Sequence, residues 1–412
     1  MMFKNLIKRN FLLNLLFKWL KKQYILLYVK KNGIYFAEED SALQSDLIPF
    51  FRGYCLWKDE GEPDIIFRIG KYKRDAFLFE NKEIKKRYPK LKSTGFFQLL
   101  NPQEISANEE LYITFGFSGK IQKNYSTGWL LNEKRKEKFI EAKNKKLNSI
   151  STILKCPSCA SDQIMESSNL LKCDNCNTVY GSNKNHFNLL TSELKDRAVV
   201  KYTENISSND YDPEAAKIIE SLKDGLILDN GSGLRGHYYE NVVNFEIVDY
   251  PTTDVIGIGE KLPFKDEVFD AAFSLNVLEH VKDPFQYVKE LKRVVKKGGV
   301  IYAAAPFLQP YHGYPYHYFN MTSEGLRTLF EDTNIIKSGE VKMGHPIFGI
   351  SWILNEYLNG LSGRQKRKFS HLKVKDLIKD PAGQLSASYT KNLSNQARNI
   401  ISCVNFVVCK KN

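Results

Sequence analysis

The stretch that decides the fold is Leu226-Ile-Leu-Asp-Asn-Gly-Ser-Gly-Leu-Arg-Gly236, an apolar run followed by closely spaced glycines. A short apolar run of this kind is typical of a buried strand. Glycine adopts backbone conformations that other residues avoid, so Gly231 and Gly233 let the chain turn sharply and approach a ligand closely. The spacing predicts a cofactor-binding loop in an α/β domain, for NAD, FAD or S-adenosylmethionine.

Two acidic residues narrow the choice of cofactor. Asp229 directly precedes the glycines, where its carboxylate can receive the amino group of a ligand. Phe245–Asp249 predicts a second strand that ends in an acid 20 residues after Asp229. A carboxylate at that place is suited to binding two ribose hydroxyls.

Further motifs follow in order: Leu262-Pro-Phe264, Phe269-Asp270, Asn276-Val-Leu-Glu279-His280-Val281, a helix start at Asp283-Pro284, and Gly298-Gly299. Together with residues 228–233 these motifs lie within residues 228–299. In this order they resemble the class I S-adenosylmethionine-dependent methyltransferases, most closely the small-molecule and glycan type. The resemblance implies an α/β fold over residues 200–412, with a seven-stranded, mostly parallel, doubly wound sheet. Its final strand is expected at Ser402–Cys409.

The resemblance also implies a set of cofactor-binding residues: Asp229, Gly231 and Gly233 at the methionine part, Asp249 at the ribose, and Asn276 and Leu278 in the loop after the fourth strand. One position departs from the family pattern. Ile258 stands where relatives have an acid that contacts the adenine amino group. We expect Glu260 or the backbone to take over that contact.

Histidines on the ligand side of the sheet are the candidate general bases for an alcohol acceptor. His312 and His317 lie in segment 307–322, which contains four tyrosines and follows the expected fifth strand. Tyrosine rings and hydroxyls suit sugar recognition. His280 is a third candidate. The alternatives for this segment are a packed lid without a catalytic role and a metal site at His312 and His317.

Two CxxC pairs, Cys156/Cys159 and Cys173/Cys176, are separated by 13 residues. Four thiolates presented on two tight turns complete a tetrahedral site with no open position. We therefore predict a structural Zn²⁺ site over residues 151–190, with iron, disulfides or free thiols as alternatives. The segment resembles the zinc ribbons that precede some methyltransferase domains.

Residues 32–125 contain four short runs rich in β-branched and aromatic residues, at 65–69, 76–79, 95–100 and 111–117. This pattern predicts a small β-sandwich. The segment resembles a module that accompanies sugar-processing enzymes of bacterial surface-glycan pathways. The likeness lies in Gly53–Trp57, Glu83–Tyr88 and Ser93–Phe96.

The net charge of +13 is concentrated at the N-terminal side, where residues 1–150 hold 29 Lys and Arg against 17 Asp and Glu. Residues 1–31 contain no acid and place Leu12, Leu16 and Trp19 at helical spacing. They predict a basic amphipathic helix, packed on its own protein or docked on an anionic membrane surface. Residues 126–150 predict a solvated, charged linker helix.

These observations favour an O-methyltransferase that acts on a sugar or lipid-linked glycan in cell-surface polysaccharide biosynthesis. The scattered cysteines are not a secreted disulfide framework, which indicates a cytoplasmic enzyme, with peripheral contact at the inner face of the membrane. The alternative is an RNA methyltransferase that holds phosphates with the zinc ribbon and basic N-terminus. Nucleic acid is less favoured because residues 151–412 carry a net charge of only +1. A scaffold that has lost catalysis is a third reading.

Overall fold

The computed structural model describes residues 23–29, 34–38, 50–58, 61, 63–79, 82–117, 120–131, 133–167, 170–182, 185–198, 211–235, 237–313, 316–341, 344–378 and 381–401. Residues 23–29 are helical, and the rest of the predicted helix at 1–31 lies outside the described residues. The predicted strand Ser402–Cys409 also lies outside them. Within these ranges no helix is both long enough and apolar enough to cross a membrane.

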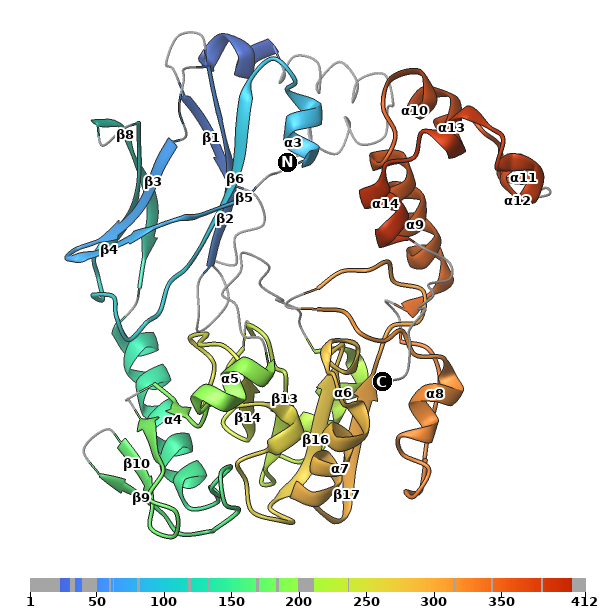
Figure 1. Ribbon diagram of the computed structural model, residues 1–412. Coiled ribbons are helices and arrows are strands. Elements are labelled where there is room, and N and C mark those ends of the chain that lie inside the picture. The colour runs from blue at the N-terminus through green and yellow to red at the C-terminus, as the bar shows by residue number, and fades with distance from the viewer. Residues whose placement is uncertain are drawn as a thin grey trace.

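The N-terminal part consists of two antiparallel four-stranded sheets, with strand orders β1-β2-β6-β5 and β4-β3-β7-β8 (Figure 1). Their strands are β1 (Ile34–Glu38), β2 (Phe50–Trp57), β3 (Pro63–Ile69), β4 (Tyr72–Asp75), β5 (Phe77–Phe79), β6 (Lys92–Leu99), β7 (Glu110–Phe117) and β8 (Lys120–Leu130). One core joins the two sheets, because Phe96 of β6 packs against Phe67 of β3 and Phe115 of β7. This arrangement is a β-sandwich. Helix 23–29 and α3 (Lys82–Arg87) pack outside the first sheet.

A nine-stranded sheet forms the centre of the second part, in the order β17-β16-β13-β14-β15-β12-β11-β10-β9. The strands from β17 to β12 are parallel. They are β12 (Phe187–Asn188), β13 (Ile227–Asn230), β14 (Val242–Glu246), β15 (Val255–Ile256), β16 (Phe269–Leu275) and β17 (Val295–Ala304). The domain is therefore α/β with a mostly parallel sheet, and the count of seven strands stays a prediction.

The cysteine-rich segment extends this same sheet. β9 (Ile164–Ser167), β10 (Leu170–Cys173) and β11 (Val179–Ser182) continue antiparallel from β12, which pairs in parallel with β15. Leu171 and Tyr180 belong to the same apolar core as Phe245 of β14 and Val255 of β15. The segment therefore shares the hydrophobic core of the parallel sheet.

Helices α6 (Pro213–Ser221) and α7 (Pro284–Val294) pack on the parallel sheet. The predicted start of α7 is confirmed, since Asp283 caps the helix by accepting the N–H of Gln286 at 3.0 Å. The glycine loop does not lead into a helix, contrary to the usual strand–turn–helix pattern. Instead, α4 (Glu133–Ser151), which arrives from the sandwich, covers this region, and its Phe139 packs edge-on against Tyr238.

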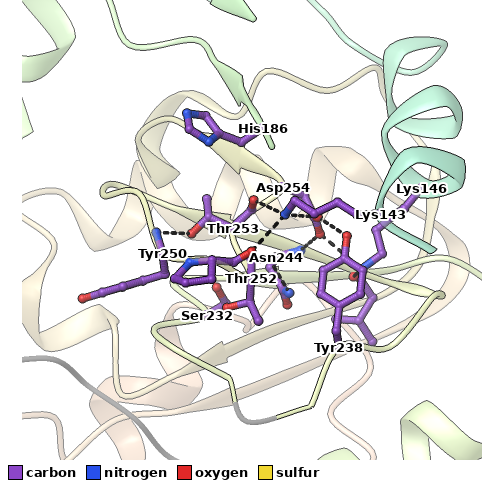
Figure 2. A network of polar contacts seen from close by, with 12 residues as sticks. Lys143, Lys146, His186, Ser232, Tyr238, Asn244, Tyr250, Thr252, Thr253 and Asp254 are labelled. Carbon is purple, nitrogen blue, oxygen red and sulfur yellow. Dashed lines mark hydrogen bonds and ion pairs between the residues drawn. The ribbon is translucent and has the colours of Figure 1, made fainter. Parts of the chain in front are cut away.

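The prediction that the charged helix is solvated is wrong for its central lysines. Lys143 and Lys146 of α4 are buried and both pair with Asp254, at 3.3 Å each (Figure 2). Lys143 also donates to the Thr253 carbonyl oxygen at 2.6 Å, and Lys146 to that of Val242 at 2.7 Å. Partners about 100 residues away in the sequence neutralise these charges, which no local pattern reveals. One face of the helix is therefore packed on the α/β domain, and the other is exposed.

Beyond β17 the regular elements of the described chain are all helices. The helices are α8 (Ser323–Thr328), α9 (Pro346–Asn359), α10 (Gly363–Ser370), α11 (Val374–Leu377), α12 (Pro381–Gln384), α13 (Ser388–Lys391) and α14 (Asn395–Ile400). Leu361, Phe369 and Tyr389 form a small separate core among them. α5 (Ser192–Ala198) lies between β12 and α6 in the sequence.

Candidate functional site

The glycine loop follows β13 at the carboxyl edge of the parallel sheet. Gly231 and Gly233 have φ values of +84° and +61°, the left-handed region that favours glycine. A Cβ atom on Gly231 would lie 2.5 Å from the side chain of Val277, in the loop after β16. The absence of a side chain therefore lets two loops from neighbouring strands meet.

Asp229 is fully buried at the end of β13. Its Oδ2 atom accepts hydrogen bonds from Tyr211 at 2.5 Å and from Arg235 at 2.9 Å. Its Oδ1 atom and the Nδ2 atom of Asn230 are buried without a hydrogen-bond partner among the described residues. Orphaned buried polar atoms carry a free-energy cost, so they indicate a missing polar partner at this position.

The acid at the end of the second parallel strand is Glu246. The predicted strand Phe245–Asp249 is instead β14, Val242–Glu246, because its neighbour β15 pairs only with Phe245 and Glu246. Glu246 accepts the N–H of Gly233 at 3.0 Å, and burial raises its pKa. Asp249 lies three residues further on, largely exposed, with its Oδ1 3.3 Å from His186 Nδ1. Sequence reasoning missed Glu246 because it placed the strand end too late.

The segment after β15 contains Ile258 and Glu260. Ile258 is buried, so the position that departs from the family pattern offers no polar group. Glu260 lies in the turn Gly259–Lys261, and its carbonyl oxygen accepts a hydrogen bond from Gln286 of α7 at 3.2 Å. A Cβ atom on Gly259 would lie 2.1 Å from the ring of Tyr287, so the turn packs tightly on α7.

The loop after β16 holds Asn276 and Leu278. Asn276 has φ +57°, a conformation that asparagine tolerates better than most residues. Its N–H donates to the carbonyl oxygen of Ala304 on β17 at 2.9 Å. Leu278 is fully buried in the main core. This backbone geometry fixes the positions of Val277, beside the glycine loop, and of Glu279 and His280.

The structure brings the three predicted histidines together. The ring centroids of His280 and His312 are 5.1 Å apart, and those of His312 and His317 are 4.5 Å apart. Burial lowers the pKa of His280 to about 4, and it also lowers that of His317. His280 comes from the β16 loop and the other two from the segment after β17, so the cluster lies at the ligand edge of the sheet.

Hydrogen bonds fix the roles of the ring nitrogens. His280 Nδ1 lies 2.8 Å from the Tyr316 carbonyl oxygen, and His312 Nδ1 lies 2.9 Å from that of Pro310. His317 Nδ1 accepts the N–H of His312, and its Nε2 lies 2.8 Å from the Asn320 Oδ1. Both His317 nitrogens are thus engaged, whereas His280 and His312 each keep Nε2 for another partner.

Glu279 is the residue of this cluster that sequence reasoning missed. Its side chain is fully buried, and neither carboxylate oxygen has a hydrogen-bond partner among the described residues. Burial raises its pKa to about 7. Its backbone carbonyl oxygen accepts the N–H of Tyr318 at 2.6 Å, which ties the tyrosine-rich segment to the β16 loop. The flanking apolar residues Leu278 and Val281 were the sequence signal for its burial.

The four cysteines of the two CxxC pairs converge. Sγ atoms are 3.7 Å apart for Cys156 and Cys176 and 3.6 Å apart for Cys159 and Cys173. All four lie within 4.8 Å of one another. Sulfur atoms of a tetrahedral zinc site with bonds of about 2.3 Å are separated by about 3.8 Å, so the cluster is compatible with bound zinc.

Fold and site together define the class of the α/β part. Residues 237–303 match a family model described as a methyltransferase domain, and they run from directly after the glycine loop through most of β17. The chain therefore carries a class I methyltransferase domain. S-adenosylmethionine is the cofactor that such a domain implies. The Asp229 Oδ1 atom, buried without a partner beside Gly231 and Gly233, fits it.

The chain is also similar to two groups of proteins, of which only the second is named as methyltransferases. An uncharacterized protein of Methanocaldococcus jannaschii is 34% identical over 87 residues, 21% of this chain and 40% of that protein. Uncharacterized methyltransferases from two strains of Mycobacterium leprae are each 42% identical over 57 residues, 14% of this chain and 21% of theirs. The chain thus spans less than half the length of the relatives it matches.

Proposed function

We propose that the protein transfers a methyl group from S-adenosylmethionine to a hydroxyl group of a sugar or lipid-linked glycan in cell-surface polysaccharide biosynthesis. The observation that carries the proposal is the meeting of two sets of residues at one sheet edge. The glycine loop with its orphaned Asp229 oxygen contacts the β16 loop through Gly231 and Val277. The β16 loop in turn carries His280 of the histidine cluster.

In this proposal Asp229 receives the amino group of the cofactor through its Oδ1 atom, while Arg235 and Tyr211 hold Oδ2. Glu246 binds the ribose hydroxyls, in place of Asp249. Because Glu246 already accepts the Gly233 N–H, its carboxylate is positioned against the glycine loop. Charge-assisted hydrogen bonds from two hydroxyls would offset the cost of burying this acid.

The bound cofactor supplies a methyl group already activated on a sulfonium. The protein then has to orient the acceptor hydroxyl and accept its proton. His280 and His312 have an Nε2 atom free for that role, whereas His317 is held at both nitrogens by His312 and Asn320. We therefore assign proton removal to the side of the cluster formed by His280 and His312, and a positioning role to His317.

Exposed aromatic and apolar side chains beside the cluster support a glycan or lipid-linked acceptor. Tyr311, Tyr316 and Tyr318 are exposed on the segment after β17, where rings can stack on a sugar. Helix α9 contacts this segment, since Gly349 packs against Leu308. On its surface α9 exposes Ile347, Ile350 and Trp352. An apolar surface next to a polar aromatic loop suits a sugar carried on a lipid.

The second candidate, an RNA substrate, loses support from α4. Lys143 and Lys146 of this basic helix are buried and paired, so they are not available to phosphates. Zinc at the four cysteines is a structural part of the proposal, and docking of residues 1–31 on an anionic membrane surface remains a prediction.

A test of the proposal combines cofactor binding with acceptor discrimination. Calorimetry should show binding of S-adenosylhomocysteine to the full-length chain. Transfer of labelled methyl from S-adenosylmethionine should then be measured on lipid-linked oligosaccharides, nucleotide sugars and RNA. We expect label in a saccharide fraction, lost in Gly231→Arg. No cofactor binding would reject the methyltransferase function, and label in RNA alone would reject the glycan acceptor.

A further inference from the structure

We propose that Glu279, His280 and His312 form a binding site for a divalent transition-metal ion at the acceptor side of the methyltransferase domain. One ligand atom from each residue lies within 4.8 Å of the others. This cluster is separate from the four cysteines, and it joins the loop after β16 to the segment after β17. The site rests on this geometry, and its part in catalysis rests on the proposed function.

The hydrogen bonds of His280 and His312 occupy Nδ1 in each ring and leave Nε2 able to bind a metal. A carbonyl oxygen only accepts, so the Nδ1 atoms of His280 and His312 carry the proton they share with Tyr316 and Pro310. In the neutral ring the lone pair then lies on Nε2. Metal-binding histidines commonly donate their other N–H to a backbone carbonyl in this way, which fixes the ring orientation.

The carboxylate of Glu279 supplies the second, independent observation. It is fully buried, neither oxygen accepts a hydrogen bond among the described residues, and Oε1 lies 3.8 Å from His280 Nε2. Burying a carboxylate without hydrogen-bond or charge partners raises the free energy of the folded protein. A cation between Oε1 and the two Nε2 atoms would remove that cost.

The neighbouring residues support the ligands rather than join them. His317 engages both nitrogens, one with the His312 N–H and one with Asn320, so it is excluded as a ligand and holds the His312 backbone. Gly313 lets the segment close over His280, because a Cβ atom there would lie 2.7 Å from the His280 ring.

Two imidazole nitrogens and one carboxylate oxygen suit zinc, iron, cobalt or manganese better than calcium or magnesium, which prefer all-oxygen ligands. Three protein ligands leave at least one position open, unlike the closed four-sulfur cluster. In the proposed reaction the acceptor hydroxyl oxygen would bind at that position, which orients it toward the methyl group and lowers its pKa. With the metal bound, the Nε2 atoms of His280 and His312 are ligands, so they would promote proton removal through the metal, and the proton would leave to solvent.

Cobalt(II) is a suitable probe because the two kinds of site differ in absorption. Bound to nitrogen and oxygen it gives weak d–d bands, whereas thiolate ligands add strong charge-transfer bands. Full-length protein that carries one equivalent of zinc, enough for the four-cysteine cluster alone, should bind one equivalent of Co²⁺ with d–d bands alone. Glu279→Gln and His312→Ala should weaken this binding by more than about tenfold, while His371→Ala, at an exposed histidine, should leave it unchanged.

The proposal is overturned if no saturable d–d signal appears, if both ligand variants bind as tightly as wild type, or if only charge-transfer bands develop. Calorimetry with S-adenosylhomocysteine on the same samples separates the two proposals. Cobalt binding without cofactor binding would retain the metal site and reject the methyltransferase function. Cofactor binding without cobalt binding would retain the methyltransferase function and reject the metal site.

Discussion

Lys143 of helix α4 and Asp254, directly before β15, form an ion pair of 3.3 Å in which both side chains are fully buried. Lys146 pairs with the other oxygen of the same carboxylate, and its Nζ lies 3.4 Å from the ring centroid of Tyr238. Figure 2 shows both lysines reaching from α4 into the sheet. The Asp254 carboxylate thus pairs with two lysines of α4. These ion pairs attach α4, which follows the sandwich in the sequence, to the parallel sheet.

Asp254→Ala should destabilise the protein strongly. The substitution leaves two buried ammonium groups without their counter-ion, a change that typically costs about 3–5 kcal/mol. Urea unfolding followed by circular dichroism measures it. The matched control is Lys145→Met on the same helix, where the lysine is exposed and pairs with exposed Glu240, so its effect should stay within about 0.5 kcal/mol. Equal effects of the two variants would contradict an internal role for this ion pair.

The stability contributed by Lys146 should depend on pH. Burial lowers the pKa of Lys146 from 10.5 to about 8. The charge of Lys143 lowers this pKa further, whereas the Asp254 carboxylate raises it in part. Between pH 8 and pH 10.5 Lys146 holds its proton in the unfolded chain but has lost it in the folded protein. The free energy of unfolding therefore rises with pH over this range. The unfolding free energy of wild type relative to Lys146→Met should therefore increase by up to about 3 kcal/mol between pH 8 and 10.5. A flat or falling difference would show that the lysine stays charged when folded.

The parts of this structure that could be predicted from sequence are those set by local pattern. The glycine loop and the Asp283 cap follow from residue type and local spacing. The gathering of the histidines follows from the rule that loops after parallel strands meet at one edge. The burial of Lys143 could not be predicted, because its partner Asp254 is 111 residues away. The orphaned state of Glu279 likewise depends on a tyrosine-rich segment that folds over it. Glu246 was missed because the length of a strand depends on its neighbour, and β15 is only two residues long.

Glu246→Gln should weaken binding of S-adenosylhomocysteine by about tenfold or more, since it removes the charge from hydrogen bonds to the ribose. Asp249→Asn is the matched control and should bind like wild type, because Asp249 is exposed and lies outside β14. Isothermal calorimetry measures both dissociation constants. Weaker binding in Asp249→Asn than in Glu246→Gln would instead support Asp249 as the residue that binds the ribose.

Removal of metal from the cysteine cluster should disorder more than a peripheral ribbon. Cys173 ends β10, and Leu171 and Tyr180 of the same hairpin pack in the core shared with Phe245. Cys173→Ser, or treatment with a strong chelator, should release one zinc per chain and lower the melting temperature of the whole α/β domain. Zinc content by mass spectrometry and melting by calorimetry measure the two effects. Cys55→Ser, in the sandwich core, should leave the zinc content unchanged. A chelator that leaves the melting transition intact would exclude a structural metal.

Gly313→Ala should impair methyl transfer while cofactor binding persists. Gly313 has φ +134°, and a Cβ atom would lie 2.7 Å from His280 Cε1 and 2.9 Å from its Nδ1. The methyl group must displace either the segment or the His280 ring, which breaks the hydrogen bond between His280 and the Tyr316 carbonyl oxygen. Misplacement of a reacting group by about 1 Å commonly costs about 100-fold in rate, so kcat should fall by that order.

Gly339→Ala is the matched control, since nothing lies within 4 Å of the added atom. Labelled-methyl kinetics and calorimetry with S-adenosylhomocysteine measure the two properties. Wild-type kcat in Gly313→Ala would show that His280 has no part in positioning the acceptor, and a loss of cofactor binding would place the glycine in the cofactor site instead.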